Sequence, residues 1–438
     1  MAHQERKRVG FQDDLHGSYR DRSGQNQDTS EIDESWSSSE ISDCGNAPIL
    51  IQLSKDVSDF CSSTITVLEQ PPTPLEFMRN FVATSRPCII KNVFLEPKSN
   101  KTFGLTLDDI FEVTPPTTVI TVNVTPDGHG DCVRHVRNCA CHKNEEDEIL
   151  MFVKPLEKQM TIDALRDGLR GKQKSDRENM DHFKSKNQCL TEEKRYAFPI
   201  KCHCQPTEEN DVSGDAELSS SGDVLYYSLQ DDCLRSTDNW SALWESGLIP
   251  KTVDFAEEAF GSGPPDAVNI WIGNENAVSS MHMDHYENMF YVASGEKLFT
   301  LCPPSDVAFL HWKKVQAGTF SKAKGNWQVI PDKDNHGKPS MINWIQPDLH
   351  EYLQCCGGKT ECEPNEASFC ERHFPLLSLT HPMEIKVKAG EMLYLPPLWF
   401  HRVTQSCETV GINYWYDMKF DTKWCYFQML QRMALDNT

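Results

Sequence analysis

Two stretches decide the fold: MFYVASGEKLFTLCPP at residues 289–304 and MEIKVKAGEMLYLPPLWFHRV at residues 383–403. Both consist of short runs of aromatic and β-branched residues, which favour strands, separated by Gly and Pro, which favour turns. Three further stretches share this character: VLYYSLQ (224–230), AVNIWIG (267–273) and TVGINYWYDM (409–418). Their spacing along the chain predicts an all-β sandwich or barrel.

The rest of the chain divides by composition around this core. Five parts are predicted: a disordered polar tail (1–46), an N-terminal α/β segment (47–128), a long polar, cysteine-containing insertion (129–222), the β core (223–417) with a cysteine-rich insertion at about 352–382, and a C-terminal helix (418–438). The tail is predicted from its richness in charged residues, Ser and Gln. Strands are expected at 86–94 and 117–128, and a strand and a helix within 145–169. Asp421 is the expected N-cap of the last helix.

The 438 residues carry 43 Lys and Arg against 65 Asp and Glu, a net charge of −22. This acidic balance argues against binding to nucleic-acid phosphates, which requires clustered cations, and favours basic partners. The sequence shows neither an apolar run of about 18 residues nor a secretory signal, so we expect no membrane contact. The odd number of cysteines, 17, then indicates reduced thiols in an intracellular protein, cytoplasmic or also nuclear.

A candidate metal site lies in the β core. His282 and Asp284 end one strand-like segment, and residues two apart on a strand point to the same face. They can therefore share one cation, with His401 in LPPLWFHRV, 119 residues later, as a third ligand. Two histidines and one carboxylate form the facial triad of non-heme Fe(II) oxygenases. The alternative is that both histidines are ordinary, partly buried side chains with hydrogen-bond partners.

Polar residues around this triad indicate a pocket for a dicarboxylate. Lys297 is expected on the strand after His282, where it could hold a distant carboxylate as a point charge. Tyr226, Ser279 and Asn288 could supply neutral hydrogen-bonding groups. Each of these residues would be unexceptional alone, and together they predict a co-substrate pocket.

Three segments carry a family resemblance: AVSSMHMDHYENMFYVASGEKLFTLCPPSD (277–306), AGEMLYLPPLWFHRV (389–403) and GINYWYDM (411–418). They resemble the jumonji-C family of 2-oxoglutarate-dependent oxygenases and, within it, a subgroup of peptidases and (3S)-lysyl hydroxylases. The resemblance covers about residues 50–130 and 224–435. It implies a mainly β fold, a double-stranded β-helix (a jelly-roll, cupin-like barrel) with an N-terminal α/β segment and C-terminal helices.

The resemblance also implies the chemistry. The implied Fe(II) ligands are His282, Asp284 and His401, and the implied 2-oxoglutarate contacts are Lys297 (to the C5 carboxylate), Tyr226, Ser279, Asn288, Asn413 and Trp415. With O₂ as the second co-substrate, 2-oxoglutarate becomes succinate and CO₂ while a C–H bond is hydroxylated. The implied substrate is a lysine of a protein, such as the translation-associated GTPases that relatives modify. Ser279 departs from the Thr that is common at this position, although it keeps the hydroxyl.

Three other functions stay open. A JmjC histone lysine demethylase is disfavoured because no reader domain or basic patch accompanies the barrel. A divalent-metal-dependent peptidase could use the same triad, but no His-Glu-x-x-His motif is present. A non-catalytic, cupin-like binding module is disfavoured because all three candidate ligands and Lys297 are intact.

Two features remain outside this core. Cysteines cluster in both insertions: Cys139, Cys141, Cys202 and Cys204 in the first, and Cys355, Cys356, Cys362 and Cys370 in the second. Four thiolates can close a structural Zn²⁺ site, but this spacing is less specific than paired Cys-x-x-Cys, so no zinc site is predicted. Apolar residues near one face of the C-terminal helix, among them Trp424 and Phe427, are expected to pack on the core and are also a candidate homodimer surface.

Overall fold

The computed structural model describes residues 47–95, 103–137, 148–171, 198–200, 222–356 and 373–436. The polar tail predicted over 1–46 lies outside these residues, and so do the side chains of the clustered cysteines in both predicted insertions. Within the described part of the chain, no helix has the length and apolar character that a membrane crossing requires.

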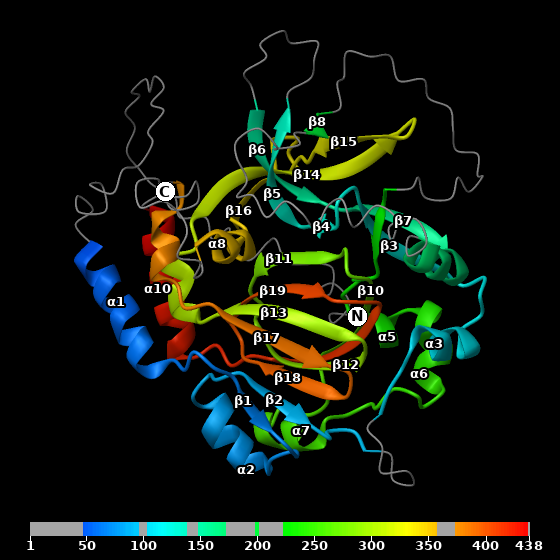
Figure 1. The fold of residues 1–438 in the computed structure, drawn as a ribbon, viewed down its shortest axis with the longest axis horizontal. Coiled ribbons are helices and arrows are strands. Elements are labelled where there is room, and N and C mark those ends of the chain that lie inside the picture. Colours follow the sequence, from blue (N-terminus) through cyan, green and yellow to red (C-terminus); the bar gives the residue numbers. More distant parts are fainter. Residues whose placement is uncertain are drawn as a thin grey trace.

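Two curled sheets form the centre of the molecule (Figure 1). The first runs in the order β1 (Thr66–Leu68), β2 (Cys88–Lys91), β18 (Glu391–Leu395), β12 (Tyr286–Ser294), β20 (Thr409–Asp417), β10 (Ala267–Gly273). The second runs in the order β17 (Met383–Lys388), β13 (Glu296–Cys302), β19 (Phe400–Gln405), β11 (Val278–His282), β4 (His129–Gly130). Four pairs of consecutive strands, β10 with β11, β12 with β13, β17 with β18 and β19 with β20, are divided between the two sheets. The predicted double-stranded β-helix, mainly β with N-terminal and C-terminal helices, is confirmed.

The apolar faces of the two sheets pack against each other. Phe290 of β12 meets Phe299 of β13 edge to face, with ring centroids 5.5 Å apart. On β17 the residues alternate between a buried set (Met383, Ile385, Val387) and an exposed set (Glu384, Lys386, Lys388). This period of two arises because only one face of the strand contacts the core.

A glycine makes the sharp connection between β12 and β13. Gly295 has φ +79°, a conformation that L side chains rarely adopt. A Cβ atom there would lie 2.5 Å from the carbonyl oxygen of Glu408, which is too close for a real contact. The turn therefore requires glycine on both conformational and steric grounds.

A third sheet lies beside β11 and β4, over one end of the barrel (Figure 1). Its strands are β15 (Asn326–Pro331), β14 (Trp312–Ala323), β6 (Glu148–Lys154), β5 (Cys132–Arg137) and β8 (Phe198–Pro199), with β16 (Met341–Ile345) also paired to β14. A smaller sheet contains β7 (Leu156–Thr161), β3 (Val119–Thr125) and β9 (Val224–Tyr226). Residues 129–171, the first part of the predicted insertion, thus build the strands that surround the barrel opening, and a helix follows at 162–171.

The other helices are short except at the two ends of the described chain. They are α1 (Ala47–Phe60), α2 (Pro74–Phe77), the π-helix η3 (Met78–Val82), α3 (Leu107–Val113), α5 (Cys233–Ser236), η5 (Asp238–Trp240), α6 (Ser241–Glu245), α7 (Asp254–Phe260), η6 (Pro304–Ala308), α8 (Leu349–Cys356), η7 (Pro375–Leu379) and α10 (Thr422–Asp436). Helix α10 begins as predicted, because the backbone N–H of Lys423 donates to Oδ1 of Asp421 at 2.8 Å. Phe427 of α10 is buried against the core, with its ring centroid 6.2 Å from that of Phe400.

Candidate metal centre

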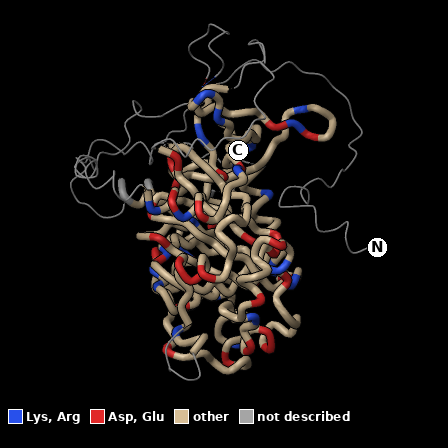
Figure 2. The backbone as a smooth tube through the Cα atoms, turned by 90° about the vertical axis from the view of Figure 1, so that its right-hand side faces the viewer, with Lys and Arg blue, Asp and Glu red and all other residues tan. Residues whose placement is uncertain are grey.

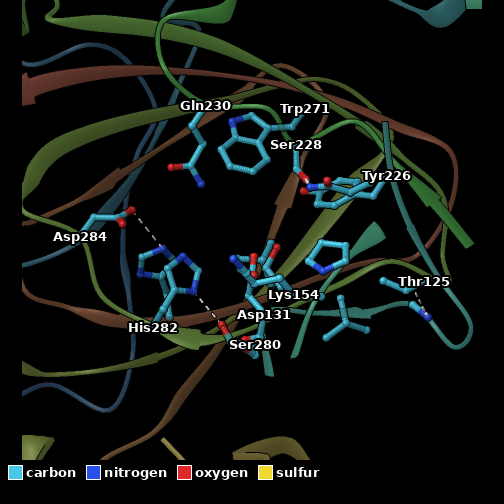
Figure 3. A pocket seen from close by; sticks show the side chains of 18 of the residues that line it. Thr125, Asp131, Lys154, Tyr226, Ser228, Gln230, Trp271, Ser280, His282 and Asp284 are labelled. Atoms are coloured by element: carbon cyan, nitrogen blue, oxygen red, sulfur yellow. Dashed lines mark hydrogen bonds and ion pairs between the residues drawn. The ribbon is translucent and has the colours of Figure 1, made fainter. Parts of the chain in front are cut away.

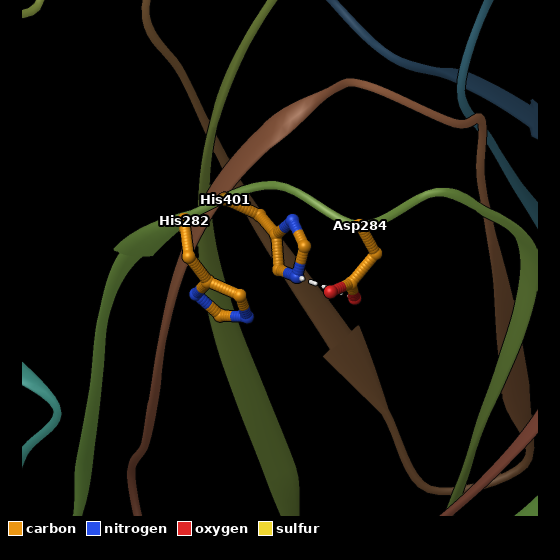
Figure 4. A group of neighbouring side chains, drawn as sticks. All are labelled: His282, Asp284 and His401. Atoms are coloured by element: carbon orange, nitrogen blue, oxygen red, sulfur yellow. Dashed lines mark ion pairs between the residues drawn. The ribbon is translucent and has the colours of Figure 1, made fainter. Parts of the chain in front are cut away.

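Two neighbouring strands bring the three predicted ligands together. Strands β11 and β19 are antiparallel, and their register pairs His282 with His401. Asp284 follows β11 by two residues. The candidate ligand atoms of the three side chains all lie within 4.8 Å of one another, and Figure 4 shows them converging on one point. Within the described ranges this is the one group of three or more His, Cys, Asp or Glu with metal-binding spacing.

The chain segment before His401 is shaped to place the acid. Leu398 adopts the left-handed conformation, with φ +67°, in the turn that follows Pro396 and Pro397. Its backbone N–H donates to the carbonyl oxygen of Asp284 at 2.9 Å. This hydrogen bond ties the residue after β11 to the turn before β19, and Oδ2 of Asp284 lies 3.6 Å from Nε2 of His401.

Backbone carbonyls set the orientation and tautomer of both imidazoles. Nδ1 of His282 lies 2.6 Å from the carbonyl oxygen of Ser280, and Nδ1 of His401 lies 3.0 Å from that of Trp399. A carbonyl oxygen can only accept, so Nδ1 carries the proton in each ring and Nε2 keeps its lone pair for a metal. Burial and the neighbouring His282 lower the pKa of His401 to about 4, which keeps this ligand neutral at physiological pH.

The residues fit a divalent iron ion. Oδ1 of Asp284 is buried without a hydrogen-bond partner among the described residues, which is costly unless a cation or donor meets it. Two neutral imidazole nitrogens and one carboxylate on one side of a centre match the 2-His-1-carboxylate set that Fe(II) prefers, and leave positions for further ligands. The donor set and the orphaned oxygen thus both call for a metal here.

The triad lies in the wall of a cavity of about 490 Å³ (Figure 3). All nine residues predicted to bind metal or 2-oxoglutarate line this one cavity: His282, Asp284, His401, Tyr226, Ser279, Asn288, Lys297, Asn413 and Trp415. They come from strands β9, β11, β12, β13, β19 and β20, together with the turn after β11. The structure therefore gathers the full predicted set in one place.

Lys297 is a buried cation in this cavity. Its side chain is 1% exposed, and its ammonium donates to Oε1 of Gln405 at 2.9 Å and to the hydroxyl of Tyr226 at 3.2 Å. The structure shows no acidic partner for it in the described part of the chain, and burial lowers its pKa to about 7. A buried ammonium held by two neutral groups is suited to a carboxylate ligand, which would restore its full charge.

Neutral polar groups of the cavity wall are also available to a ligand. The hydroxyl of Ser279 hydrogen-bonds to that of Tyr226, which joins both to Lys297. Three buried polar atoms lack a hydrogen-bond partner among the described residues: Oδ1 of Asn288, Nδ2 of Asn413 and Nε1 of Trp415. Asn413 is fixed by its other side-chain atom, since Oδ1 accepts from Nε1 of Trp271 at 2.9 Å.

Several cavity residues were missed from the sequence. Gln405, the direct partner of Lys297, lies four residues after His401 and has no motif of its own. The outer end of the cavity is lined by Asp131, Lys154 and Glu157, all from the predicted insertion, and by Trp344, from a part of the predicted β core in which no strand was named. Their positions depend on how the third sheet and the smaller sheet of β7, β3 and β9 pack on the barrel, and local sequence gives no signal for that.

Known proteins match the chain over most of its length. The family model described as "Cupin-like domain" matches residues 74–422. The human protein named "Bifunctional peptidase and (3S)-lysyl hydroxylase JMJD7" is 30% identical over 84% of this chain and 89% of its own length. "JmjC domain-containing protein E" of Dictyostelium discoideum is 31% identical over 87% of this chain and 92% of its own length. "Lysine-specific demethylase JMJ32" of Arabidopsis thaliana is 28% identical over 83% of this chain and 85% of its own length.

Proposed function

The chain belongs to the cupin-like, JmjC-domain family of oxygenases, and on that premise we propose that it hydroxylates a lysine side chain of a protein with Fe(II), 2-oxoglutarate and O₂. The proposal rests on one observation: the same cavity contains a triad of the Fe(II)-binding type and a buried lysine that has no acidic partner among the described residues. The triad supplies the metal chemistry and the lysine supplies an anchor for a dicarboxylate.

The residues of the chain have separate tasks in this reaction. Bound Fe(II) supplies the activation of O₂ that the protein itself cannot provide. Lys297 holds the far carboxylate of 2-oxoglutarate, and the hydroxyls of Tyr226 and Ser279 fix its direction. Trp271 and Phe290 line the same cavity and exclude water from it, which favours coupling of co-substrate consumption to hydroxylation.

Lysine is the proposed target for two reasons. The name of the human relative includes (3S)-lysyl hydroxylase, and the net charge of −22 favours a basic partner. Figure 2 shows Lys and Arg interspersed with Asp and Glu along the described backbone, a distribution that gives no support to a nucleic-acid substrate. Lysine-bearing segments of translation-associated GTPases are the first substrates to test.

The test is an anaerobic titration with Fe(II) and 2-oxoglutarate, followed by O₂ and by parallel measurement of succinate and of peptide mass. We expect succinate together with a lysine heavier by one oxygen atom. Succinate formation no greater than that of a His282→Ala variant would contradict the oxygenase, and would leave the non-catalytic binding module.

Demethylation is the second candidate, because a relative of comparable coverage is named as a lysine-specific demethylase. The same titration separates the two reactions, since hydroxylation of an N-methyl group releases formaldehyde and leaves a lysine with one methyl group fewer. A peptidase reaction would instead produce shortened peptides without consuming 2-oxoglutarate.

A further inference from the structure

We propose that Asp131 and Glu157, at the outer end of the cavity, bind the ammonium group of an unmodified lysine and thereby select it over methylated lysine. This inference rests on the proposed function, since it names how the same site would recognise its substrate. It assigns a recognition role to two carboxylates that lie outside every motif of the barrel.

The backbone fixes Asp131 beside the metal triad. Strand β4 is paired with β11 in parallel, with Gly130 opposite Ser279, and Asp131 is the next residue. The hydroxyl of Ser280, two residues before His282, donates to the carbonyl oxygen of Asp131. The carboxylate of Asp131 is close enough to interact electrostatically with His282, and Figure 3 shows both side chains at the same cavity.

The two carboxylates line the same part of the cavity. Asp131 and Glu157 interact electrostatically with each other, and neither has a hydrogen bond or ion pair within the described residues. The one cation in this part of the cavity wall, Lys154, is already paired, since its ammonium lies 2.8 Å from Oδ2 of Asp332. Lys154 also interacts electrostatically with Asp131, but one lysine faces the three carboxylates of Asp131, Glu157 and Asp332, so this end of the cavity has a net negative charge.

Orphaned polar atoms show independently that the cavity is built for a ligand. The side chains of Asp284, Asn288, Asn413 and Trp415 are each at least nine-tenths buried, line the cavity and carry a polar atom without a partner among the described residues. The acidic outer end opens into the same space. A lysine ammonium held by the two carboxylates would place its methylene carbons in the same cavity as the triad.

Chemistry explains the selection. An unmodified ammonium offers three N–H donors to two carboxylates, whereas a trimethylated one offers none and a larger radius. Holding the nitrogen at Asp131 also presents the methylene carbons, rather than N-methyl groups, to the metal. The two carboxylates thus favour hydroxylation of the side-chain carbons over demethylation.

The experiment measures binding geometry without turnover. The full chain is loaded with Mn(II) in place of Fe(II) and with 2-oxoglutarate, and proton relaxation is recorded on three probes: Nα-acetyl-lysine methylamide, its Nε-trimethyl form and the norleucine analogue. Paramagnetic Mn(II) relaxes protons of a probe only when that probe binds near the triad. We expect the lysine probe to be relaxed most strongly and the norleucine probe hardly at all.

Variants then assign the effect to residues. Asp131→Asn and Glu157→Gln should each weaken binding of the lysine probe about tenfold and reduce its advantage over the trimethyl probe. Asn is the matched change at position 131, where φ is +52°, because Asn tolerates the left-handed conformation as Asp does. The control Glu245→Gln makes the same charge change on the exposed end of α6, outside the cavity, and should have no effect.

Each result decides between the two claims. Equal relaxation of the lysine and norleucine probes, no relaxation of any probe, or wild-type binding in both variants would overturn the inference. Retained affinity for 2-oxoglutarate shows that a variant is folded. If Asp131→Asn does not fold, Glu157→Gln alone tests the inference. Carboxylate-dependent binding without hydroxylation of lysine under Fe(II) and O₂ would contradict the proposed function alone, because recognition would stand without that reaction.

Discussion

The inner and outer ends of the cavity differ in origin and in environment. The inner end, with His282, His401 and Lys297, lies on barrel strands and is largely buried, whereas the outer end, with Asp131 directly after β4 and Glu157 on β7, is exposed to solvent. A charge matters more where water cannot screen it. We therefore expect changes at the inner end to decide whether the hydroxylation reaction occurs, and changes at the outer end to decide which substrate side chain binds.

The largest effect should come from removing a metal ligand at the inner end. Loss of even a residue that supports a ligand costs about 10–100-fold in metal affinity, so His282→Ala should cost at least about 100-fold and abolish succinate formation. Metal binding by calorimetry and succinate by mass spectrometry check this. The control His336→Ala, in an exposed turn, should behave as the wild type.

Replacing the buried cation should separate co-substrate binding from stability. Lys297→Met removes one partner of a buried charge pair in the complex, so the KM for 2-oxoglutarate should rise about 30-fold or more. The unliganded protein should become no less stable, because a buried ammonium without an acidic partner is lost. Steady-state kinetics test the rise in KM and thermal unfolding tests the unchanged or higher stability, with Lys386→Met, at an exposed position, as the control. An unchanged KM would move the dicarboxylate anchor elsewhere.

The lowered pKa of Lys297 predicts a pH dependence. The unliganded ammonium has a pKa of about 7, and a bound carboxylate raises it, so binding of 2-oxoglutarate takes up a proton above pH 7. Affinity should then fall as pH rises, by up to about tenfold per unit. Calorimetry at pH 8 in buffers of different ionisation enthalpy should show uptake of about 0.9 proton per ligand. Uptake that persists in Lys297→Met would assign the proton to another group.

The lowered pKa of Lys297 also predicts how the free energy of unfolding changes with pH. Between pH 7 and 10.5 the unfolded lysine is protonated and the folded one is not, so the unfolded state binds more protons. The contribution of Lys297 to the free energy of unfolding therefore rises with pH across this window and is constant below it.

A change at the outer end should leave the inner end intact. Trp344 of β16 packs on Phe152 with ring centroids 4.5 Å apart, and its Nε1 donates to the hydroxyl of Ser280 at 3.4 Å. Trp344→Ala should raise the KM for a lysine substrate about tenfold and change the 2-oxoglutarate affinity less than twofold. A large loss of 2-oxoglutarate affinity would show that the two ends are not independent.

The smallest effect should come from the hydroxyl of Ser279. Ser279→Thr keeps the hydrogen bond to Tyr226 and should change the KM for 2-oxoglutarate less than about threefold. Ser279→Ala removes that bond and should raise this KM about fivefold. Steady-state kinetics of Ser279→Thr and Ser279→Ala compare the effect of an added methyl group with that of a lost hydroxyl. Equal changes in the KM for 2-oxoglutarate would mean that the hydroxyl has no part in binding.

How much the sequence predicts follows the same division. The strands around His282 and Lys297 were predictable because a strand fixes spacing and facing over a few residues, and the family resemblance fixed their pairing with His401. Residues 129–171 were interpreted as a polar insertion, although a strand and a helix were expected within them. Nothing local predicts that Gly130 pairs with Ser279, since that contact joins segments about 150 residues apart.

The pairing of β11 with β19 also has a consequence for synthesis. His401 is translated 119 residues after His282, and at about 5–20 residues per second the nascent chain carries one metal ligand for roughly 6–24 s before the other exists. The central strand β12 likewise cannot pair when it is first made, because both of its neighbours, β18 and β20, are translated later. We therefore expect iron to enter only after His401 has been translated and β19 has paired with β11.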